Sequence, residues 1–242
     1  MREIIFGRLF KMKRETALIT GSSKGLGENL ALNFSKNNYN VILHGRNEQK
    51  LEKVKNEILK NKVECYMVSG DIRLDKTLNE LTKIAKEKDL SILINNAGID
   101  LESPFQNLSE SRLEEVLYTN LISPIKLINQ IYPFFLEKKS GTIININSID
   151  GFKAKPLRSI YCASKYGLKG FTDSLRFEAK KNNIRVIGVY PSGMNTDMAK
   201  AAGLNVDKCM NTDEVAEIIL SCCKSYSSAS VDELVINRNR YD

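Results

Sequence analysis

The chain has 242 residues, of which 42% are hydrophobic and 27% are charged, and this balance excludes a disordered or fibrous protein. No apolar run approaches the roughly 18 residues of a membrane-spanning helix, so we expect a soluble protein of a single domain. The net charge is +7 at pH 7, but the lysines and arginines are spread over the predicted helices, which argues against nucleic acid as a partner.

The N-terminal residues 1–14 carry five cations between short apolar pieces. These pieces are too short for a secretory signal, so we expect a poorly ordered basic tail followed by one domain over residues 15–242. The five cysteines show no paired spacing, which fits a reducing, cytoplasmic location. The single histidine, His44, cannot supply a metal site by itself, so we predict a packed structural role for it and no metal.

The pattern of apolar residues predicts seven β-strands, at residues 16–20, 41–44, 63–69, 92–95, 142–148, 185–190 and 234–236. Helix-length segments lie between them, at residues 26–37, 48–60, 74–88, 111–137, 159–182 and 212–225. Because the strands lack strict alternation and are separated by helices, they indicate a parallel sheet covered on both faces. The predicted fold is therefore α/β, a single doubly wound (Rossmann-type) domain.

Two prolines fall within the predicted helix 111–137, namely Pro124 and Pro133. Proline has no backbone N–H and its ring clashes with the preceding helical turn. We therefore expect this helix to be kinked or to begin after Pro124.

A glycine-rich turn follows the first predicted strand and leads directly into a helix, with the sequence Thr20-Gly21-Ser22-Ser23-Lys24-Gly25-Leu26-Gly27. Glycines at these spacings let the chain turn sharply, let a diphosphate approach the backbone and let the helix pack against the strand, while the helix N-terminus faces the anion. Tight turns also use glycine for steric reasons alone. In this strand-turn-helix context, binding of a dinucleotide phosphate is the favoured interpretation.

Three further motifs follow in order: Asn95-Asn96-Ala97-Gly98 after the fourth strand, Ser148 after the fifth, and Tyr161-Cys162-Ala163-Ser164-Lys165 on the next helix. Together with the glycine turn they resemble the short-chain dehydrogenase/reductase family over residues 16–236, including its NADP-preferring 3-oxoacyl-carrier-protein reductases and carbonyl reductases. The resemblance implies an oxidoreductase that moves a hydride between a nicotinamide cofactor and a carbonyl or alcohol.

The end of the second strand indicates which cofactor is used. An enzyme that prefers NAD usually places an acid there to hold the ribose 2′-hydroxyl, whereas this chain has His44-Gly45-Arg46. Arg46 can stack on the adenine and bind a 2′-phosphate, and Lys24 in the glycine turn can supply a second positive charge. The alternative is that both are ordinary surface cations. We predict NADP(H).

The resemblance implies further cofactor contacts. Asp71 and Ile72 would lie at the adenine and Asn96 to Gly98 along the ribose, although Asp71 could instead cap the next helix and residues 96–98 could be only a turn. Ser192 replaces the family's usual glycine in the loop after the sixth strand, so its backbone must avoid positive φ or tolerate strain. The complete predicted set is Gly21, Ser23, Lys24, Gly25, Leu26, Gly27, Arg46, Asp71, Ile72, Asn96, Ala97, Gly98, Tyr161, Lys165, Pro191 and Thr196.

The predicted catalytic residues are Asn120, Ser148, Tyr161 and Lys165. Carbonyl reduction leaves negative charge on oxygen, which a neighbouring group must protonate. Tyr161 can do so, and Lys165 one helical turn later supplies a cation that favours the phenolate. Ser148 can hold the substrate oxygen. By resemblance, Lys165 also binds the nicotinamide ribose, and Asn120 kinks its helix and positions a water on a proton path to the lysine.

The loop between Ser148 and Tyr161 carries three cations, Lys153, Lys155 and Arg158. It must cross the mouth of the site, because its two ends carry the substrate-holding serine and the proton donor. One hypothesis is that at least one of these cations meets an anionic group on the substrate. The alternative is that all three point to water.

The substrate and partners stay open at this point. The substrate is a small-molecule carbonyl or an acyl thioester; Lys138-Lys139 and Lys180-Lys181 could bind an acidic carrier protein, although the helix dipole also favours cations there. An NADPH-binding regulator without turnover is the alternative from another class. The resemblance implies a homotetramer or homodimer joined through the helices at 111–137 and 159–182. We expect neither nucleic acid nor membrane as a partner.

Overall fold

The computed structural model describes residues 14–201, 203, 205–223 and 229–239. Within them, seven parallel strands form one sheet in the order β3-β2-β1-β4-β5-β6-β7. Their bounds are β1 Thr16–Ile19, β2 Asn40–Gly45, β3 Cys65–Ser69, β4 Leu90–Asn95, β5 Gly141–Ile146, β6 Ile184–Pro191 and β7 Glu233–Ile236. This confirms the predicted fold class. The strand order reverses between β1 and β4, and in doubly wound sheets ligands bind at the carboxyl ends of the strands beside such a reversal.

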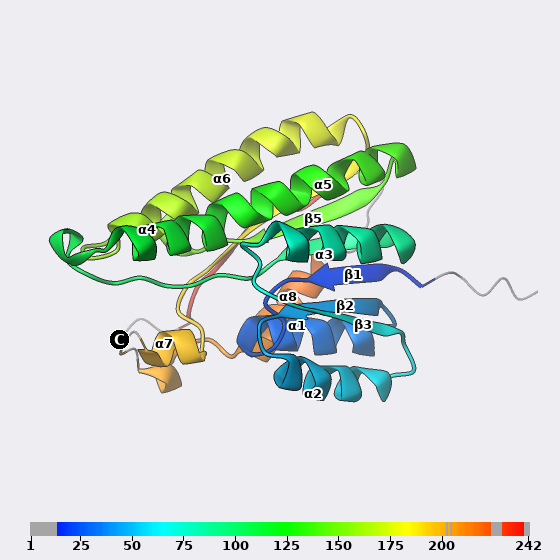
Figure 1. The fold of residues 1–242 in the computed structure, drawn as a ribbon, viewed down its shortest axis with the longest axis horizontal. Coiled ribbons are helices and arrows are strands. Elements are labelled where there is room, and N and C mark those ends of the chain that lie inside the picture. The colour runs from blue at the N-terminus through cyan, green and yellow to red at the C-terminus, as the bar shows by residue number, and fades with distance from the viewer. Residues whose placement is uncertain (1–13, 202, 204, 224–228, 240–242) are drawn as a thin grey trace, which may run out of the picture.

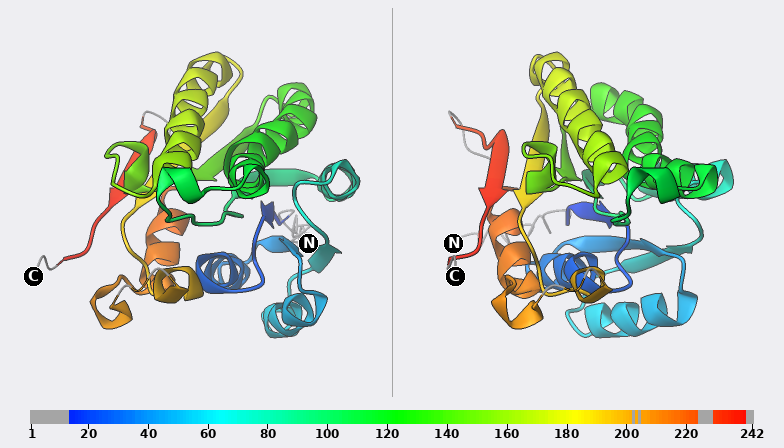
Figure 2. Two further views of the ribbon diagram at one scale, coloured as in Figure 1. Left: turned by 60° about the vertical axis from the view of Figure 1, so that its left-hand side comes forward. Right: turned by 90° about the vertical axis from the view of Figure 1, so that its left-hand side faces the viewer.

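Helices cover both faces of the sheet, as Figures 1 and 2 show. Helices α1, α2 and α8 lie on one face and α3, α5 and α6 on the other, while α7 lies beyond the carboxyl ends of the strands (Figure 1). The bounds are α1 Gly25–Lys36, α2 Glu48–Leu59, α3 Asp75–Glu87, α4 Glu110–Leu117, α5 Ser123–Lys138, α6 Ser159–Lys180, α7 Asp197–Ala201 and α8 Thr212–Ser221.

Strand β1 contributes side chains to two hydrophobic clusters, one on each face of the sheet. Ala17 and Ile19 are fully buried in the cluster that contains Phe34 of α1, whereas Leu18 between them is fully buried in the cluster that contains Leu127 of α5. Successive side chains of a strand point to opposite faces. An uninterrupted apolar run therefore fits a strand with a helix layer on each side, which is why this pattern predicted the fold.

The segment predicted as one helix over 111–137 is divided in the structure. Helix α4 ends at Leu117, a π-helical turn η2 spans Tyr118–Ile122, and α5 begins at Ser123. The N–H of Ser123 bonds to the carbonyl of Tyr118, five residues earlier, which is the pattern of a π-helical turn. Pro124 has no N–H for the next bond of the helix. The break thus precedes Pro124, whereas Pro133 lies inside α5.

The N-terminal tail is described only at its last residue. Arg14 donates hydrogen bonds to the Asn38 side chain at 2.7 Å and to the Lys62 carbonyl at 2.9 Å, so this residue is fixed to the loops that precede β2 and β3. Residues 1–13 of the predicted tail, and residues 224 and 225 of the predicted helix 212–225, lie outside the described residues. No helix among the described residues is long and apolar enough to cross a membrane.

Candidate active site

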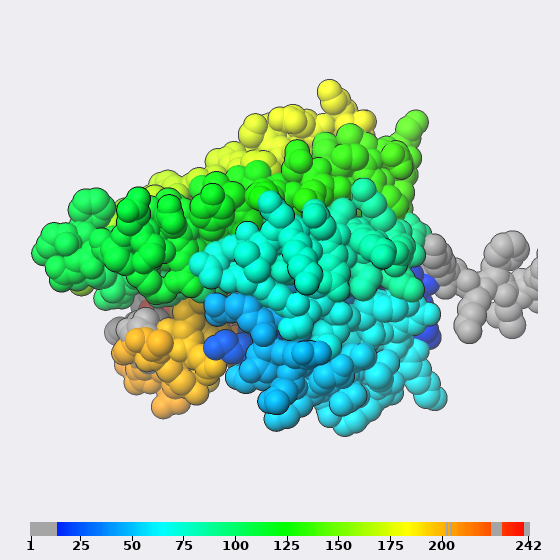
Figure 3. Space-filling view, in the orientation of Figure 1, coloured from blue at the N-terminus to red at the C-terminus, as the bar shows by residue number. Residues whose placement is uncertain are grey.

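A cleft of about 1060 Å³ lies at the carboxyl ends of the strands, beside the reversal of strand order. In the space-filling view, the α7 segment (orange) lies below the projecting α4 (green) and next to atoms of the first strand-helix unit (blue) (Figure 3). Most of the predicted site residues line this cleft: Gly21, Ser23, Lys24, Gly25, Leu26, Gly27, Arg46, Asp71, Ile72, Asn96, Ala97, Gly98, Tyr161, Lys165 and Thr196. The cleft lining does not include Asn120, Ser148 or Pro191.

The glycine turn leaves no room for side chains at two of its positions. Gly21 has a φ of +66°, and a Cβ there would lie 2.8 Å from the Cα of Ala97. A Cβ on Gly27 would lie 2.2 Å from the carbonyl oxygen of Gly21. The turn is therefore packed directly against the 95–98 segment and against its own helix, and its backbone at the helix N-terminus stays open to a ligand in the cleft.

Hydrogen bonds tie the 95–98 segment to the end of β1. The hydroxyl oxygen of Thr20 accepts the N–H groups of Asn96 and Ala97, each at 3.0 Å. The Asn96 amide in turn donates to the carbonyls of Thr20 and Gly21, at 2.9 and 3.2 Å. The Asn96 side chain thus holds the glycine turn in shape, while Ala97 and Gly98 line the cleft.

His44 holds the same turn through hydrogen bonds of its ring. It is buried, and its Nδ1 accepts the N–H of Gly21 at 3.3 Å while its Nε2 lies 3.2 Å from the carbonyl of Gly70. Burial lowers the pKa of His44 to about 4, so the ring is neutral at pH 7 and Nε2 carries the proton. The predicted structural role of this residue is confirmed.

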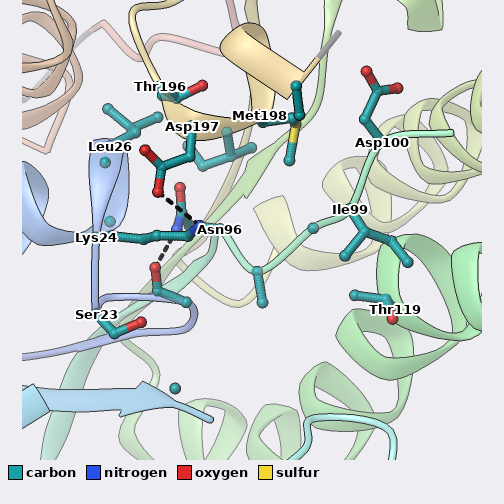
Figure 4. Close-up of a pocket in the computed structure, with 18 of the residues that line it drawn as sticks. Ser23, Lys24, Leu26, Asn96, Ile99, Asp100, Thr119, Thr196, Asp197 and Met198 are labelled. Atoms are coloured by element: carbon teal, nitrogen blue, oxygen red, sulfur yellow. Dashed lines mark hydrogen bonds and ion pairs between the residues drawn. The ribbon is translucent and has the colours of Figure 1, made fainter. Parts of the chain in front are cut away.

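Two cations flank the outer part of the cleft. Arg46 is exposed after β2, and Lys24 forms an ion pair with Asp197 of α7, with 3.0 Å between Nζ and Oδ2. Figure 4 shows this pair above the glycine turn. The Lys24 ammonium lowers the pKa of Asp197.

Asp71 does not cap the following helix, so that alternative is wrong. Helix α3 begins at Asp75 with Leu74 as its N-cap. The Asp71 carboxylate instead accepts the backbone N–H of Arg73 at 2.9 Å and a fork of bonds from the Arg73 guanidinium at 2.6 to 3.1 Å. These hydrogen bonds hold the pKa of Asp71 below its usual range.

Tyr161 and Lys165 lie side by side on the first turns of α6. Their side chains are buried, and the Lys165 Nζ is 5.7 Å from the centre of the Tyr161 ring and 3.2 Å from the carbonyl oxygen of Ile146. Burial lowers the pKa of Lys165 to about 8. Burial and the nearby Asp100 raise the pKa of Tyr161, whereas its hydrogen bond with Ser148 lowers it. Ser148 thus meets the phenol at the end of β5.

Asn120 lies within the π-helical turn and is 1% exposed. Its amide accepts the N–H of Ile99 and donates to the carbonyl of the same residue, both at 2.9 Å, and also donates to the Ser164 hydroxyl at 3.2 Å. The helix interruption therefore brings Asn120 between the 98–100 segment and α6. A Cβ on Gly98 would lie 3.4 Å from Asn120 Oδ1 and 3.9 Å from Lys165 Nζ.

The loop after β6 connects the sheet to the cleft. Pro191 pairs with Ile236 of β7. Ser192 is not among the described residues with positive φ, so its backbone avoids the strain that a glycine-specific conformation would impose. Thr196 lines the cleft, and its hydroxyl accepts the N–H of Ala199 at 3.2 Å at the start of α7.

Sequence reasoning missed a charge cluster beside Tyr161. Arg158 donates to Asp150 at 2.7 Å and also to Asp100, while Lys155 forms an ion pair with Asp150 at 2.7 Å. Of the three cations of which at least one was hypothesised to meet an anionic substrate, Lys155 and Arg158 are therefore already paired with carboxylates of this chain. The sequence shows Asp100 after the 95–98 motif and Asp150 after Ser148, but it does not indicate that the two loops meet at Arg158.

Comparison with known proteins agrees with this geometry. The family model for short chain dehydrogenases matches residues 15–207. An uncharacterized oxidoreductase of Staphylococcus saprophyticus is 29% identical over 233 residues, covering 94% of this chain and 99% of that protein. A ketoacyl reductase of Nostoc is 29% identical over 236 residues, covering 93% of this chain and 79% of that protein.

Solved structures share the fold. A short-chain dehydrogenase from Sphingobium yanoikuyae, in complex with NADPH, superposes with a TM-score of 0.82 at 26% identity, covering 92% of this chain and 87% of that chain. An alcohol dehydrogenase from Thermococcus sibiricus superposes with a TM-score of 0.87 at 22% identity, covering 95% and 98% of the two chains. With its fold, its cleft and its matched motifs, the chain belongs to the short-chain dehydrogenase family and is an oxidoreductase.

Proposed function

We propose that the protein is an NADP(H)-dependent oxidoreductase that reduces a carbonyl group or oxidises the matching alcohol. One observation carries this proposal: Tyr161, with Ser148 and Lys165 against it, lies in the same cleft as a glycine turn that has no room for side chains. The similar Sphingobium enzyme was solved with NADPH, which supports the same cofactor here.

The residues of the cleft fit a dinucleotide with a 2′-phosphate. The backbone of the glycine turn at the start of α1 suits the diphosphate, and a carboxylate at the end of β2, which would repel a 2′-phosphate, is replaced by Arg46. Lys24 adds a second cation within reach of the cleft. Asp71, beside Ile72, would accept a hydrogen bond from the adenine amino group. When bound, the nicotinamide supplies or accepts the hydride.

The side chains of the site would handle the proton. A phenol whose pKa lies above its usual value of about 10 is protonated at neutral pH, and this is the state that a donor needs in carbonyl reduction. Tyr161 would pass its proton to the substrate oxygen that Ser148 holds. The Lys165 ammonium would stabilise the phenolate that remains. Asn120 would help to return a proton from solvent towards Lys165.

A ketoacyl thioester is the second candidate substrate, because the Nostoc relative is named a ketoacyl reductase. The cations proposed to meet an acidic carrier protein do not all favour it: Lys138 already pairs with Asp89 at 2.6 Å and donates to the Leu90 carbonyl at 3.0 Å. The choice between thioesters and small ketones therefore rests on experiment.

The test of the proposed function is the loss of NADPH absorbance with a panel of ketones, aldehydes and acyl thioesters. We expect NADPH-dependent reduction of at least one class. Tight binding of NADPH without turnover of any panel member would contradict the proposal and favour a regulator that senses the cofactor. Because Asn120, Ser148, Tyr161 and Lys165 are all present, the structure offers no reason for lost turnover.

We also propose that two or four copies associate through α5 and α6, which lie side by side on one surface of the molecule (Figure 2). Large apolar side chains are exposed there: Phe177 is 79% exposed and Tyr166 of the same helix is 43% exposed. These two residues are eleven positions apart, about three helical turns, so they share one side of α6. Exposed aromatic side chains on one helix face are typical of protein interfaces.

Light scattering at micromolar concentration is expected to give the mass of a dimer or tetramer. The Phe177→Glu variant should shift this mass towards the monomer, since a charge would be buried without a partner. Lys53→Glu on α2, an exposed position on the other face of the sheet, serves as a control for a charge change. A wild-type monomer would contradict the association.

A further inference from the structure

Arg158 occupies a position that helix stability does not explain. It is the N-cap of α6, three residues before Tyr161, and its side chain makes no capping hydrogen bond. N-caps favour Ser, Thr, Asp and Asn, and the positive end of the helix dipole disfavours a cation there. A different interaction must therefore compensate for an arginine at this place.

That interaction is a bridge between two loops. The Arg158 Nη1 donates to Asp150 Oδ2 at 2.7 Å, and Nη2 donates to Asp100. Asp100 follows β4, whereas Asp150 lies in the 3₁₀ turn after Ser148. The side chains of Asp150, Asp100 and Arg158 are only 1%, 13% and 17% exposed. At this burial, charged hydrogen bonds are poorly screened and fix geometry.

The bridge places a cation directly on the proposed proton donor. The Arg158 Cζ lies 4.5 Å from the centre of the Tyr161 ring, within the range of a cation–π contact. The ring therefore contacts two cations, this guanidinium and the Lys165 Nζ, which is 5.7 Å from its centre. The bridge therefore limits where the phenol oxygen can lie.

The charges that face Tyr161 act in opposite directions. Burial raises the pKa of the phenol most, and Asp100 raises it further; the Ser148 hydrogen bond and Arg158 lower it, and Asp150 raises it. Lys155 also contributes, because it neutralises part of the Asp150 charge. Arg158 therefore acts against the effect of the two carboxylates on the pKa of Tyr161.

We propose that Arg158, held by Asp100 and Asp150, is a positioning residue for Tyr161: the bridge fixes the phenol in place, and its charge balance sets the pH range in which Tyr161 exchanges its proton. This inference rests on the proposed function. It adds the prediction that Asp100 and Arg158 change the pKa of the Tyr161 phenol in opposite directions. An ion pair with only a structural role would not do so.

The test uses three variants of the bridge. Asp100→Asn removes a negative charge and leaves Arg158 paired with Asp150, so it should fold. Arg158→Gln removes the cation and leaves both carboxylates facing the ring. Arg158→Lys keeps the charge but loses the planar fork that contacts two carboxylates at once. The matched control is Asp173→Asn, which breaks ion pairs with Lys169 and Arg176 on the same helix. Asp173 lies about 18 Å from Tyr161 along the axis of α6.

Two readouts follow the phenol. The first is the pH dependence of kcat/KM for oxidation, with NADP⁺, of the alcohol that matches the best carbonyl of the panel, because this rate rises as Tyr161 loses its proton. The second needs no turnover: the protein is labelled with ¹³C at tyrosine Cζ, and the NMR signal that Tyr161→Phe removes is followed through a pH titration in the NADP⁺ complex.

We expect Asp100→Asn to move both midpoints down by about 1 pH unit and Arg158→Gln to move both up by about 1 unit, the order that one nearby charge produces. Arg158→Lys should leave the midpoints in place but reduce kcat, since the ring is held less firmly. The control Asp173→Asn should leave midpoints and kcat unchanged, and all variants should bind NADPH as the wild type does.

Unmoved midpoints, or midpoints that move in the same direction in Asp100→Asn and Arg158→Gln, would overturn the inference. If Arg158→Gln does not fold, Asp100→Asn alone decides. A Tyr161→Phe variant that is inactive together with unmoved midpoints would refute only the role of Arg158. Tyr161→Phe with full turnover, or a wild type without turnover, would refute the proposed function and this inference with it.

Discussion

Replacement of Tyr161 by Phe is expected to lower kcat for carbonyl reduction by about a thousandfold, within the range that a lost general acid produces. The substitution removes a single oxygen from a side chain that is 7% exposed, so the contacts of the ring with Arg158 and Lys165 can stay. NADPH affinity, measured by fluorescence titration, should therefore be close to that of the wild type.

The control for this experiment is Tyr132→Phe on α5, which removes a phenol oxygen that does not line the cleft. It should keep wild-type kcat. If Tyr161→Phe keeps more than a tenth of wild-type kcat, the proton reaches the substrate oxygen from another group, and the proposed role of Tyr161 is wrong.

The second large effect is expected on cofactor choice. The double variant Lys24→Ala with Arg46→Ala should weaken NADPH binding by about 3 kcal/mol, roughly a hundredfold, because each charged hydrogen bond contributes about 1.5–3 kcal/mol. We take the lower value for each, since Arg46 is exposed and Lys24 must leave Asp197 to reach a phosphate. NADH has no 2′-phosphate, so its binding should change little.

The matched control removes the same charge elsewhere. Lys36→Ala with Lys53→Ala takes two positive charges from exposed positions that do not line the cleft. The dissociation constants of NADPH and NADH, measured by isothermal titration calorimetry, should stay near their wild-type values in this control. Equal loss of NADPH and NADH binding in the Lys24 and Arg46 variant would contradict the assignment of these residues to the 2′-phosphate.

Local patterns were sufficient to predict the sheet and the cleft. Apolar runs such as 16–20 have the composition of strands buried on both faces, and glycines such as Gly21 mark a turn whose steric reason is local. The motifs after β4, β5 and on α6 come together because parallel strands end at one edge of the sheet. These features need no knowledge of distant contacts.

Features that depend on several loops were not predictable from the sequence. The bridge from Arg158 to Asp100 joins residues 58 positions apart, and no periodicity links them. Asp71 has the spacing of a helix cap, but its carboxylate binds Arg73, two residues later, and not the N-terminus of α3. The resemblance predicted a kink at Asn120, which lies inside the π-helical turn Tyr118–Ile122, but nothing in the sequence indicated that the kink takes π-helical form.

This π-helical turn has a consequence for any change of chain length in this region. A π turn is one extra residue inserted into an α-helix, and removing one residue from 118–122 would restore a regular helix. Each α-helical residue advances by about 100°, so such a deletion would rotate α4 against α5 by that angle. Asn120 would leave its bonds to Ile99, and the α4 side chains that line the cleft, Arg112 and Glu115, would turn away from it. A substitution at one of these positions keeps the helix register, whereas a deletion of one residue removes the α4 side chains from the lining of the cleft.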